Sequence, residues 1–212
     1  YDVHVGGVTA YSTLGRMADP LLNTMLRQDE TYIAGLVFHE LAHQEVYVAD
    51  ETAFNEAFAT TVETTGVTRW LNHKGDREAL RRYEAANERQ TDFIRLVSNA
   101  RAELHEVYES ADSEAKKRSA KAEVIENLRR RYRGLRDGKW GGYDGYDGWF
   151  EGPINNARFA ATGVYNDLVP AFTRLFKLCG QDYPRFYRAV ERIGAEDRDR
   201  RASALQDAGG CE

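Results

Sequence analysis

Apolar side chains recur at helical spacing in two neighbouring stretches of the chain. They are Ile33, Leu36, Val37 and Leu41 in the first stretch and Phe54, Phe58 and Val62 in the second. Asp29 precedes the first stretch and can cap a helix, because its side-chain oxygen can accept a hydrogen bond from a free backbone N–H group. Gly66 follows the second stretch and can end a helix in a left-handed conformation. The pattern predicts two helices, at about 29–47 and 50–66, joined by a short connection.

The rest of the chain predicts more helix and one strand. Residues from about 75 to 136 are rich in Arg, Glu, Ala and Lys with few apolar positions, so we expect an inserted, charged helical hairpin. The segment Asp2–Thr13 combines β-branched and aromatic residues with a Gly-Gly pair, which is typical of an edge strand. The expected fold is therefore mainly α with a small β edge, in a single domain that spans residues 1–212.

Composition excludes some classes of partner. The 29 Lys and Arg residues against 34 Asp and Glu residues give a net charge of −5, so the chain has no general attraction for nucleic acid or an anionic membrane surface. No apolar run is long enough for a transmembrane segment. Cys179 and Cys211 could pair or remain thiols, and no compartment follows from them. The sequence leaves the oligomeric state open.

The run His39-Glu40-Leu41-Ala42-His43 lies within the first predicted helix. Because residues four apart share a helix face, the two histidines can direct imidazole nitrogens at one ion. Glu40 is too close in sequence to join the same coordination shell easily, but it can accept a proton from metal-bound water as a general base. Such a motif also occurs by chance on surface helices, but here it is in phase with the helix and has apolar neighbours. We expect one Zn²⁺ per chain at this motif.

A catalytic zinc site needs a third protein ligand and an open position for water. The metzincin pattern would place a third His six residues after the motif, where this chain has Ala49, so that subclass is excluded. Glu56 on the second predicted helix is our candidate for the third ligand. Glu63, two turns further on the same face, is expected to orient a metal-bound His through its other ring nitrogen. Asp50 is the competing third ligand, although a helix-capping role explains it equally well.

Several blocks of the sequence resemble the bacterial family of predicted zinc aminopeptidases. The blocks are Gly6-Gly7-Val8, the run from Ala10 to Gly15, the run from Phe38 to Gln44, the run from Phe54 to Ala59, and Asn155-Asn156-Ala157-Arg158 with Tyr165. The resemblance implies a zincin/gluzincin-like core, in which a Glu on the next helix completes the metal site. Asn55, directly before Glu56, is expected to support the metal ligands without touching the ion. The resemblance also implies a bacterial protein of the cell envelope or periplasm, and a family N-terminal portion that is absent here.

The expected function is zinc-dependent peptide-bond hydrolysis, and the resemblance implies an aminopeptidase. In this hypothesis metal-activated water attacks the scissile carbonyl, Glu40 takes its proton, and Tyr165 donates to the oxyanion. The backbone of residues 6–10 could pair with an extended peptide substrate by strand addition. The glycine-rich, aromatic loop that contains Tyr146 could form a wall of the substrate cleft. These candidate substrate-binding residues are Gly6, Gly7, Val8, Ala10 and Tyr146. The alternatives are a zinc endopeptidase, a non-peptide amide hydrolase, or a structural zinc site in a helical binding protein.

Overall fold

The computed structural model describes residues 2–3, 5, 23, 25–163, 168–206 and 211. Contacts between Cα atoms divide the chain into two compact units. Unit 1 comprises residues 1–6 and 85–164, and unit 2 comprises residues 7–84 and 165–212. The prediction of a single domain stays a prediction, and each unit is described by itself below.

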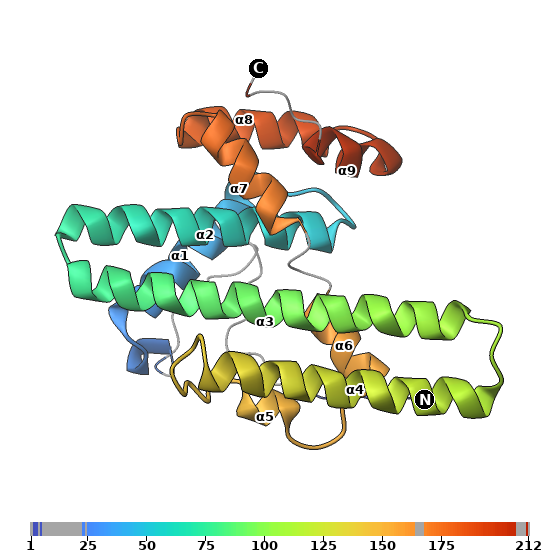
Figure 1. Ribbon diagram of the computed structural model, residues 1–212. Helices are drawn as coiled ribbons and strands as arrows, with labels where there is room; N and C mark the ends of the chain where they lie inside the picture. The colour runs from blue at the N-terminus through green and yellow to red at the C-terminus, as the bar shows by residue number, and fades with distance from the viewer. Residues whose placement is uncertain are drawn as a thin grey trace. The chain divides into compact units, whose positions relative to one another are not determined.

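Unit 2 is built from helices that come from both ends of the chain (Figure 1). They are the short 3₁₀ helix η1 (Met25–Arg27), α1 (Glu30–Glu45), α2 (Thr52–Lys74), the start of α3 (Arg77–Glu109), α7 (Val169–Leu178), α8 (Tyr183–Gly194) and α9 (Arg198–Gln206). Unit 1 contains the rest of α3 together with α4 (Glu114–Asp137), α5 (Asp147–Phe150) and α6 (Asn156–Gly163). None of the helices in the described part of the chain is both long and apolar enough to cross a bilayer.

The predicted β edge and zincin/gluzincin-like core are wrong, because the described residues form helices and no strand. Most of the segment Asp2–Thr13, which was expected to form the strand, lies outside the described residues. Of those that are described, Val3 and Val5 have largely exposed side chains, so no sheet buries them. The backbone carbonyl of Val3 accepts a hydrogen bond from the side chain of Asn155 at 3.0 Å, instead of pairing with a strand. The fold is all-α.

The start of α1 follows the sequence prediction, whereas the end of α2 does not. Asp29 caps α1, and its side chain accepts a hydrogen bond from the backbone N–H of Tyr32 at 2.8 Å. The predicted end of α2 at Gly66 is wrong, because α2 continues to Lys74 and ends at Gly75, which has a φ of 71°. Gly66 lies inside the helix, where a Cβ atom would stand 2.9 Å from the ring of Phe38. Glycine is therefore needed at this position for the close packing of α1 on α2.

The core of unit 2 is an aromatic cluster that joins α2 to α7 and α8. The ring of Phe54 meets that of Phe172 at a centroid distance of 4.9 Å, and the ring of Phe58 meets that of Phe186 at 5.7 Å. All four side chains are buried. A disulfide between Cys179 and Cys211, which the sequence left open, joins the residue after α7 to the C-terminal segment. These contacts cover the apolar face of α2 with helices rather than with a sheet.

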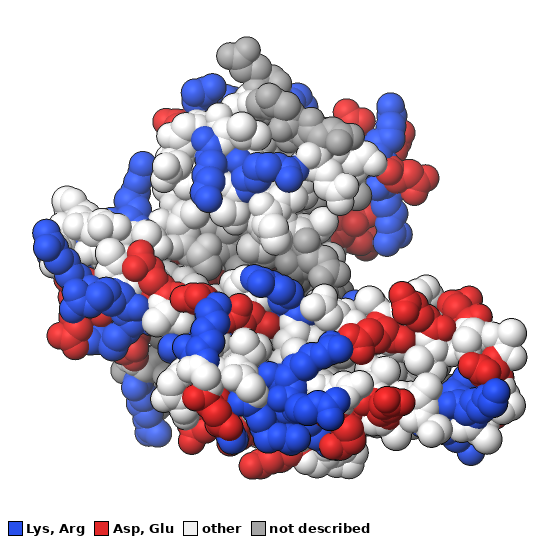
Figure 2. All heavy atoms as spheres, viewed as in Figure 1, with Lys and Arg blue, Asp and Glu red and all other residues white. Residues whose placement is uncertain are grey.

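Unit 1 is built around the hairpin of α3 and α4, in the region where the sequence indicated a charged hairpin (Figure 1). Apolar residues of α3 from Phe93 to Leu104 pack against Val124, Leu128 and Tyr132 of α4. Acidic and basic side chains lie close together over α4 in Figure 2, and Arg131 pairs with Glu103 of α3 at 2.6 Å. The outer surface of the hairpin is therefore one of mixed charge.

A buried carboxylate ties the glycine-rich loop after α4 to α3. Asp92 accepts hydrogen bonds from Lys139 Nζ at 2.7 Å and from Trp140 Nε1 at 3.1 Å. Burial raises the pKa of Asp92, but these hydrogen bonds outweigh that effect and hold it below the ordinary value. Asp92 therefore remains ionised and contributes to the stability of unit 1.

Candidate metal centre

The candidate metal centre lies where α1 and α2 pack together, and a glycine makes this approach possible. A Cβ atom on Gly35 would stand 3.2 Å from Glu63 Oε1, so the missing side chain leaves room for this carboxylate against α1. Glu63 then reaches His39, one turn further along α1. The role of Gly35 escaped the sequence prediction. Its only signal is a glycine inside an apolar helical stretch, where alanine would favour the helix more.

Two histidines of α1 and one glutamate of α2 place their ligand atoms together. One ligand atom from each of His39, His43 and Glu56 lies within 4.8 Å of the others, and this is the only such group among the described residues. Glu56 Oε2 is 3.3 Å from His39 Nε2, and Glu56 Oε1 is 3.6 Å from His43 Nε2. The two imidazole rings meet edge to face at a centroid distance of 5.0 Å. The local helical spacing and the α1–α2 packing together produce this cluster.

The spacing of these atoms fits a divalent ion such as Zn²⁺. Zinc ligands lie about 2.0–2.2 Å from the ion, which in a tetrahedral arrangement separates them by about 3.3–3.6 Å. Glu56 Oε2 lies 3.3 Å from His39 Nε2, and the other oxygen, Oε1, lies 3.6 Å from His43 Nε2, so each carboxylate oxygen has one histidine nitrogen at that separation. Two imidazoles and one carboxylate are also a donor set that suits zinc and leaves one position open.

His39 lies between two carboxylates. Its Nδ1 is 3.1 Å from Glu63 Oε2, and its Nε2 is 3.3 Å from Glu56 Oε2. Burial lowers the pKa of His39, but the hydrogen bonds to Glu56 and Glu63 outweigh this and raise it to about 9. Without a metal, His39 is thus a cation that holds both carboxylates in place. With a metal at Nε2, the Nδ1–H group can still donate to Glu63 and fix the orientation of the ring.

His43 and Glu56 have the protonation states that metal binding requires. Burial lowers the pKa of His43, and the charge of His39 lowers it further, while the charges of Glu56 and Glu40 act in the opposite direction. His43 is therefore neutral and has a nitrogen lone pair free for a metal. The hydrogen bond with His39 lowers the pKa of Glu56 despite its partial burial, so Glu56 is an anion. The buried Nδ1 of His43 has no hydrogen-bond partner among the described residues.

Glu40 and Asn55 lie next to the ligands in sequence. Glu40 follows His39 on α1, is partly buried, and is close enough for its charge to act on His43. Asn55 precedes Glu56 and is buried. Its side-chain amide donates to the backbone carbonyl of Val48 at 2.7 Å and accepts from the backbone N–H of Val48 at 2.9 Å. Asn55 therefore fixes the connection between α1 and α2, which in turn positions Glu56.

The other sequence candidates are not brought to this cluster by the described contacts. Asp50 lies in the turn between α1 and α2 with a φ of 62°, and Glu51 takes the helix-capping position instead. Tyr146 belongs to unit 1, where its ring stacks on Phe93 and its hydroxyl donates to Gln90 at 2.6 Å. The remaining candidates, Gly6, Gly7, Val8, Ala10 and Tyr165, lie outside the described residues.

The described residues form an all-α fold in which two histidines and a carboxylate are arranged as a candidate metal centre. The sequence matches the family described as "Putative aminopeptidase" over residues 1–205, and the chain belongs to that family. This agrees with the family resemblance in the sequence and indicates a peptidase. No curated protein and no solved structure matched the chain.

Proposed function

We propose that the chain is a zinc-dependent aminopeptidase in which His39, His43 and Glu56 hold one metal ion. The observation that carries the proposal is the convergence of three ligand atoms within 4.8 Å on two packed helices. Membership of an aminopeptidase family supports the assignment of peptide hydrolysis. A structural zinc site normally has four protein ligands and often contains cysteine. The only two cysteines in the chain form a disulfide with each other, so they supply no ligand.

In this proposal each charged residue of the centre has a separate task. A bound zinc ion would lower the pKa of a water molecule and polarise the scissile carbonyl. Glu40 accepts the proton of the attacking water and passes it to the leaving amine. Glu63 holds the ring of His39 through Nδ1. Tyr165 remains our candidate for the donor to the oxyanion, and Gly6, Gly7, Val8, Ala10 and Tyr146 remain candidates for substrate contact.

Metal analysis of purified variants tests the ligand set. Wild-type protein should contain about one zinc ion per chain, and Glu56→Ala should lose most of it, because two histidines alone make a weak site. Glu78→Ala is the matched control, since Glu78 is an exposed glutamate on α3 that pairs with Arg82. The control should retain wild-type zinc content. Full zinc occupancy in folded Glu56→Ala protein would overturn the ligand assignment.

Kinetics on zinc-loaded protein test the mechanism. Glu40→Gln keeps the size of the side chain but cannot accept a proton, so kcat should fall by roughly 10²-fold or more while zinc stays bound. Retained turnover would refute the role of Glu40. Peptides with free and acetylated N-termini separate the two peptidase classes. An aminopeptidase should cleave only the free form, whereas cleavage of both forms would favour the endopeptidase alternative.

A further inference from the structure

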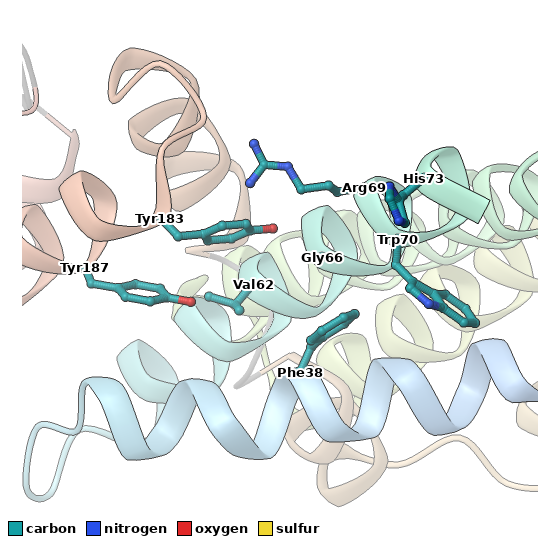
Figure 3. A pocket seen from close by; sticks show the side chains of 8 residues that line it. All are labelled: Phe38, Val62, Gly66, Arg69, Trp70, His73, Tyr183 and Tyr187. Atoms are coloured by element: carbon teal, nitrogen blue, oxygen red, sulfur yellow. The ribbon is translucent and has the colours of Figure 1, made fainter. Parts of the chain in front are cut away.

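Unit 2 contains a pocket that the metal centre does not use. Its volume is about 660 Å³, within the usual range of about 300–1,000 Å³ for small-molecule sites. The residues that determine its chemistry are four aromatic and two basic ones from α1, α2 and α8: Phe38, Trp70, Tyr183, Tyr187, Arg69 and His73 (Figure 3). None of its lining residues belongs to the metal cluster.

The pocket and the metal centre lie on different faces of the same two helices. Phe38 lines the pocket and directly precedes His39, while Val62 lines the pocket and directly precedes Glu63. Successive residues of an α-helix point about 100° apart. A molecule in the pocket therefore contacts the neighbouring faces of α1 and α2, and the metal ligands do not form its lining.

The part of the wall formed by Phe38, Tyr183 and Tyr187 is aromatic and uncharged. In Figure 3 the rings of Tyr183 and Tyr187 lie on the α8 side, and the ring of Phe38 projects from α1 below them. The hydroxyl of Tyr183 lies 3.0 Å from Thr65 Oγ1, which holds its ring in place. Burial, together with the nearby Tyr183 and Glu45, raises the pKa of Tyr187 to about 12. Burial also raises the pKa of Tyr183, so both tyrosines stay neutral, and their rings suit an apolar or aromatic group.

A cation stands at the edge of this aromatic space. The guanidinium of Arg69 lies 5.2 Å from the centroid of the Tyr183 ring, and its Nη2 donates to the backbone carbonyl of Gln181 at 3.3 Å. A guanidinium has five N–H donors, so several remain for a ligand after this hydrogen bond. No Asp or Glu lines the pocket within the part of the chain that is described. Among the described residues, no carboxylate of the pocket lining neutralises the charge of Arg69.

We propose that this pocket binds an aromatic carboxylate, with the ring among the four aromatic side chains and the carboxylate on Arg69. Arginine pairs with carboxylates through two parallel N–H groups, and His73, one turn after Arg69 on α2, also lines the pocket. Two sources share this chemistry: a free aromatic amino acid and the C-terminal aromatic residue of a peptide. The volume of the pocket exceeds that of one amino acid, so it has space for a free aromatic amino acid or for the C-terminal residue of a peptide.

Calorimetry with four probes tests the proposal on the full chain. N-acetyl-phenylalanine should bind, whereas N-acetyl-phenylalaninamide, which lacks the carboxylate, and N-acetyl-alanine, which lacks the ring, should each bind at least about tenfold more weakly. A short acetylated peptide that ends in phenylalanine separates the sources. If it binds and the acetylated amino acid does not, the pocket recognises peptide C-termini. If neither N-acetyl-phenylalanine nor the peptide binds at millimolar concentration, the proposal is overturned.

Each titration is repeated with a metal chelator, because a carboxylate could also bind a zinc ion. Binding in the pocket should survive chelation, and binding that disappears with the metal would refute the proposal without bearing on peptidase activity. Arg69→Gln should weaken binding of the acid by about tenfold to a hundredfold and leave the amide unchanged. Arg77→Gln, at an exposed position on α3, is the matched control and should bind as wild-type protein does. Equal affinity of wild-type and folded Arg69→Gln protein for the acid would also refute the proposal.

Discussion

Substitution of Glu63 by alanine tests whether the metal centre depends on a residue outside the ligand set. Glu63 Oε2 lies 3.1 Å from His39 Nδ1, and Gly35 provides the space for its carboxylate. Loss of such a partner of a metal-binding histidine typically weakens metal affinity by about 10- to 100-fold. This corresponds to about 1.4–2.7 kcal/mol of binding free energy.

The lost affinity should appear as a smaller stabilisation by zinc. If zinc binds as proposed, a free zinc concentration about 1,000 times Kd should raise the free energy of unfolding of the wild-type protein by about 4.1 kcal/mol. At the same concentration Glu63→Ala should gain only about 1.4–2.7 kcal/mol. For a protein of this size, the zinc-dependent increase in Tm should then be smaller by roughly 3–10 °C.

Thermal unfolding with and without zinc measures this quantity. The difference between the two scans is compared, because the lost hydrogen bond also changes the stability of the metal-free protein. Glu63→Gln keeps an acceptor oxygen for His39 Nδ1–H and should give an intermediate result, whereas Glu78→Ala should behave as the wild type. An unchanged zinc-dependent increase in Tm in Glu63→Ala would refute the reasoning and remove Glu63 from the metal centre.

Three further predictions concern the stability of the fold. Because the folded pKa of Asp92 is lowered, its contribution is present at neutral pH and is lost as the pH falls below about 4. Asp92→Asn should flatten this part of the stability profile in urea titrations, and an unchanged profile would contradict the assignment. Gly66→Ala should destabilise the protein by about 1–3 kcal/mol, because its Cβ would stand 2.9 Å from the partly buried ring of Phe38. At Gly134 a Cβ would meet nothing within 4 Å, so Gly134→Ala should instead stabilise the protein by about 0.5–1 kcal/mol. Equal changes in Tm for Gly66→Ala and Gly134→Ala would contradict the packing argument. Reduction of the disulfide between Cys179 and Cys211, which closes a loop with a sequence separation of 32, should lower the free energy of unfolding by about 2–4 kcal/mol, and unfolding curves with and without reductant would measure this.

The candidate metal ligands could be proposed from the sequence because their arrangement is mostly local. Helical periodicity alone places His39 and His43 on one face. Glu56 required one more assumption, that the following helix packs with its glutamates towards the motif. Apolar periodicity does not show why this packing occurs, because the residue that admits Glu63 is Gly35, which has no side chain.

The mainly α character was predicted from helical periodicity, but the β edge and the zincin/gluzincin-like core were wrong, because these features depend on contacts between distant segments. Local preference is weak evidence for a strand, since neighbouring strands supply most of its stability, and Val3 and Val5 lie exposed without such a partner in the described part. Gly66 was misjudged for a similar reason. A glycine in a helical sequence can end the helix or admit a close neighbour, and only the position of Phe38 distinguishes the two.

α3 is one uninterrupted helix whose two parts belong to different cores. Ala79 near its start packs with Val67 and Leu71 of α2, whereas its residues from Phe93 to Leu104 pack against α4. Amide hydrogen exchange along this single helix should therefore show two levels of protection, each set by the opening of the core that contains it. If zinc binds at the candidate centre between α1 and α2, it should slow exchange in the first turns of α3 and leave the turns beyond Phe93 unchanged. Amides of one continuous helix would in this way report on the stability of each unit separately.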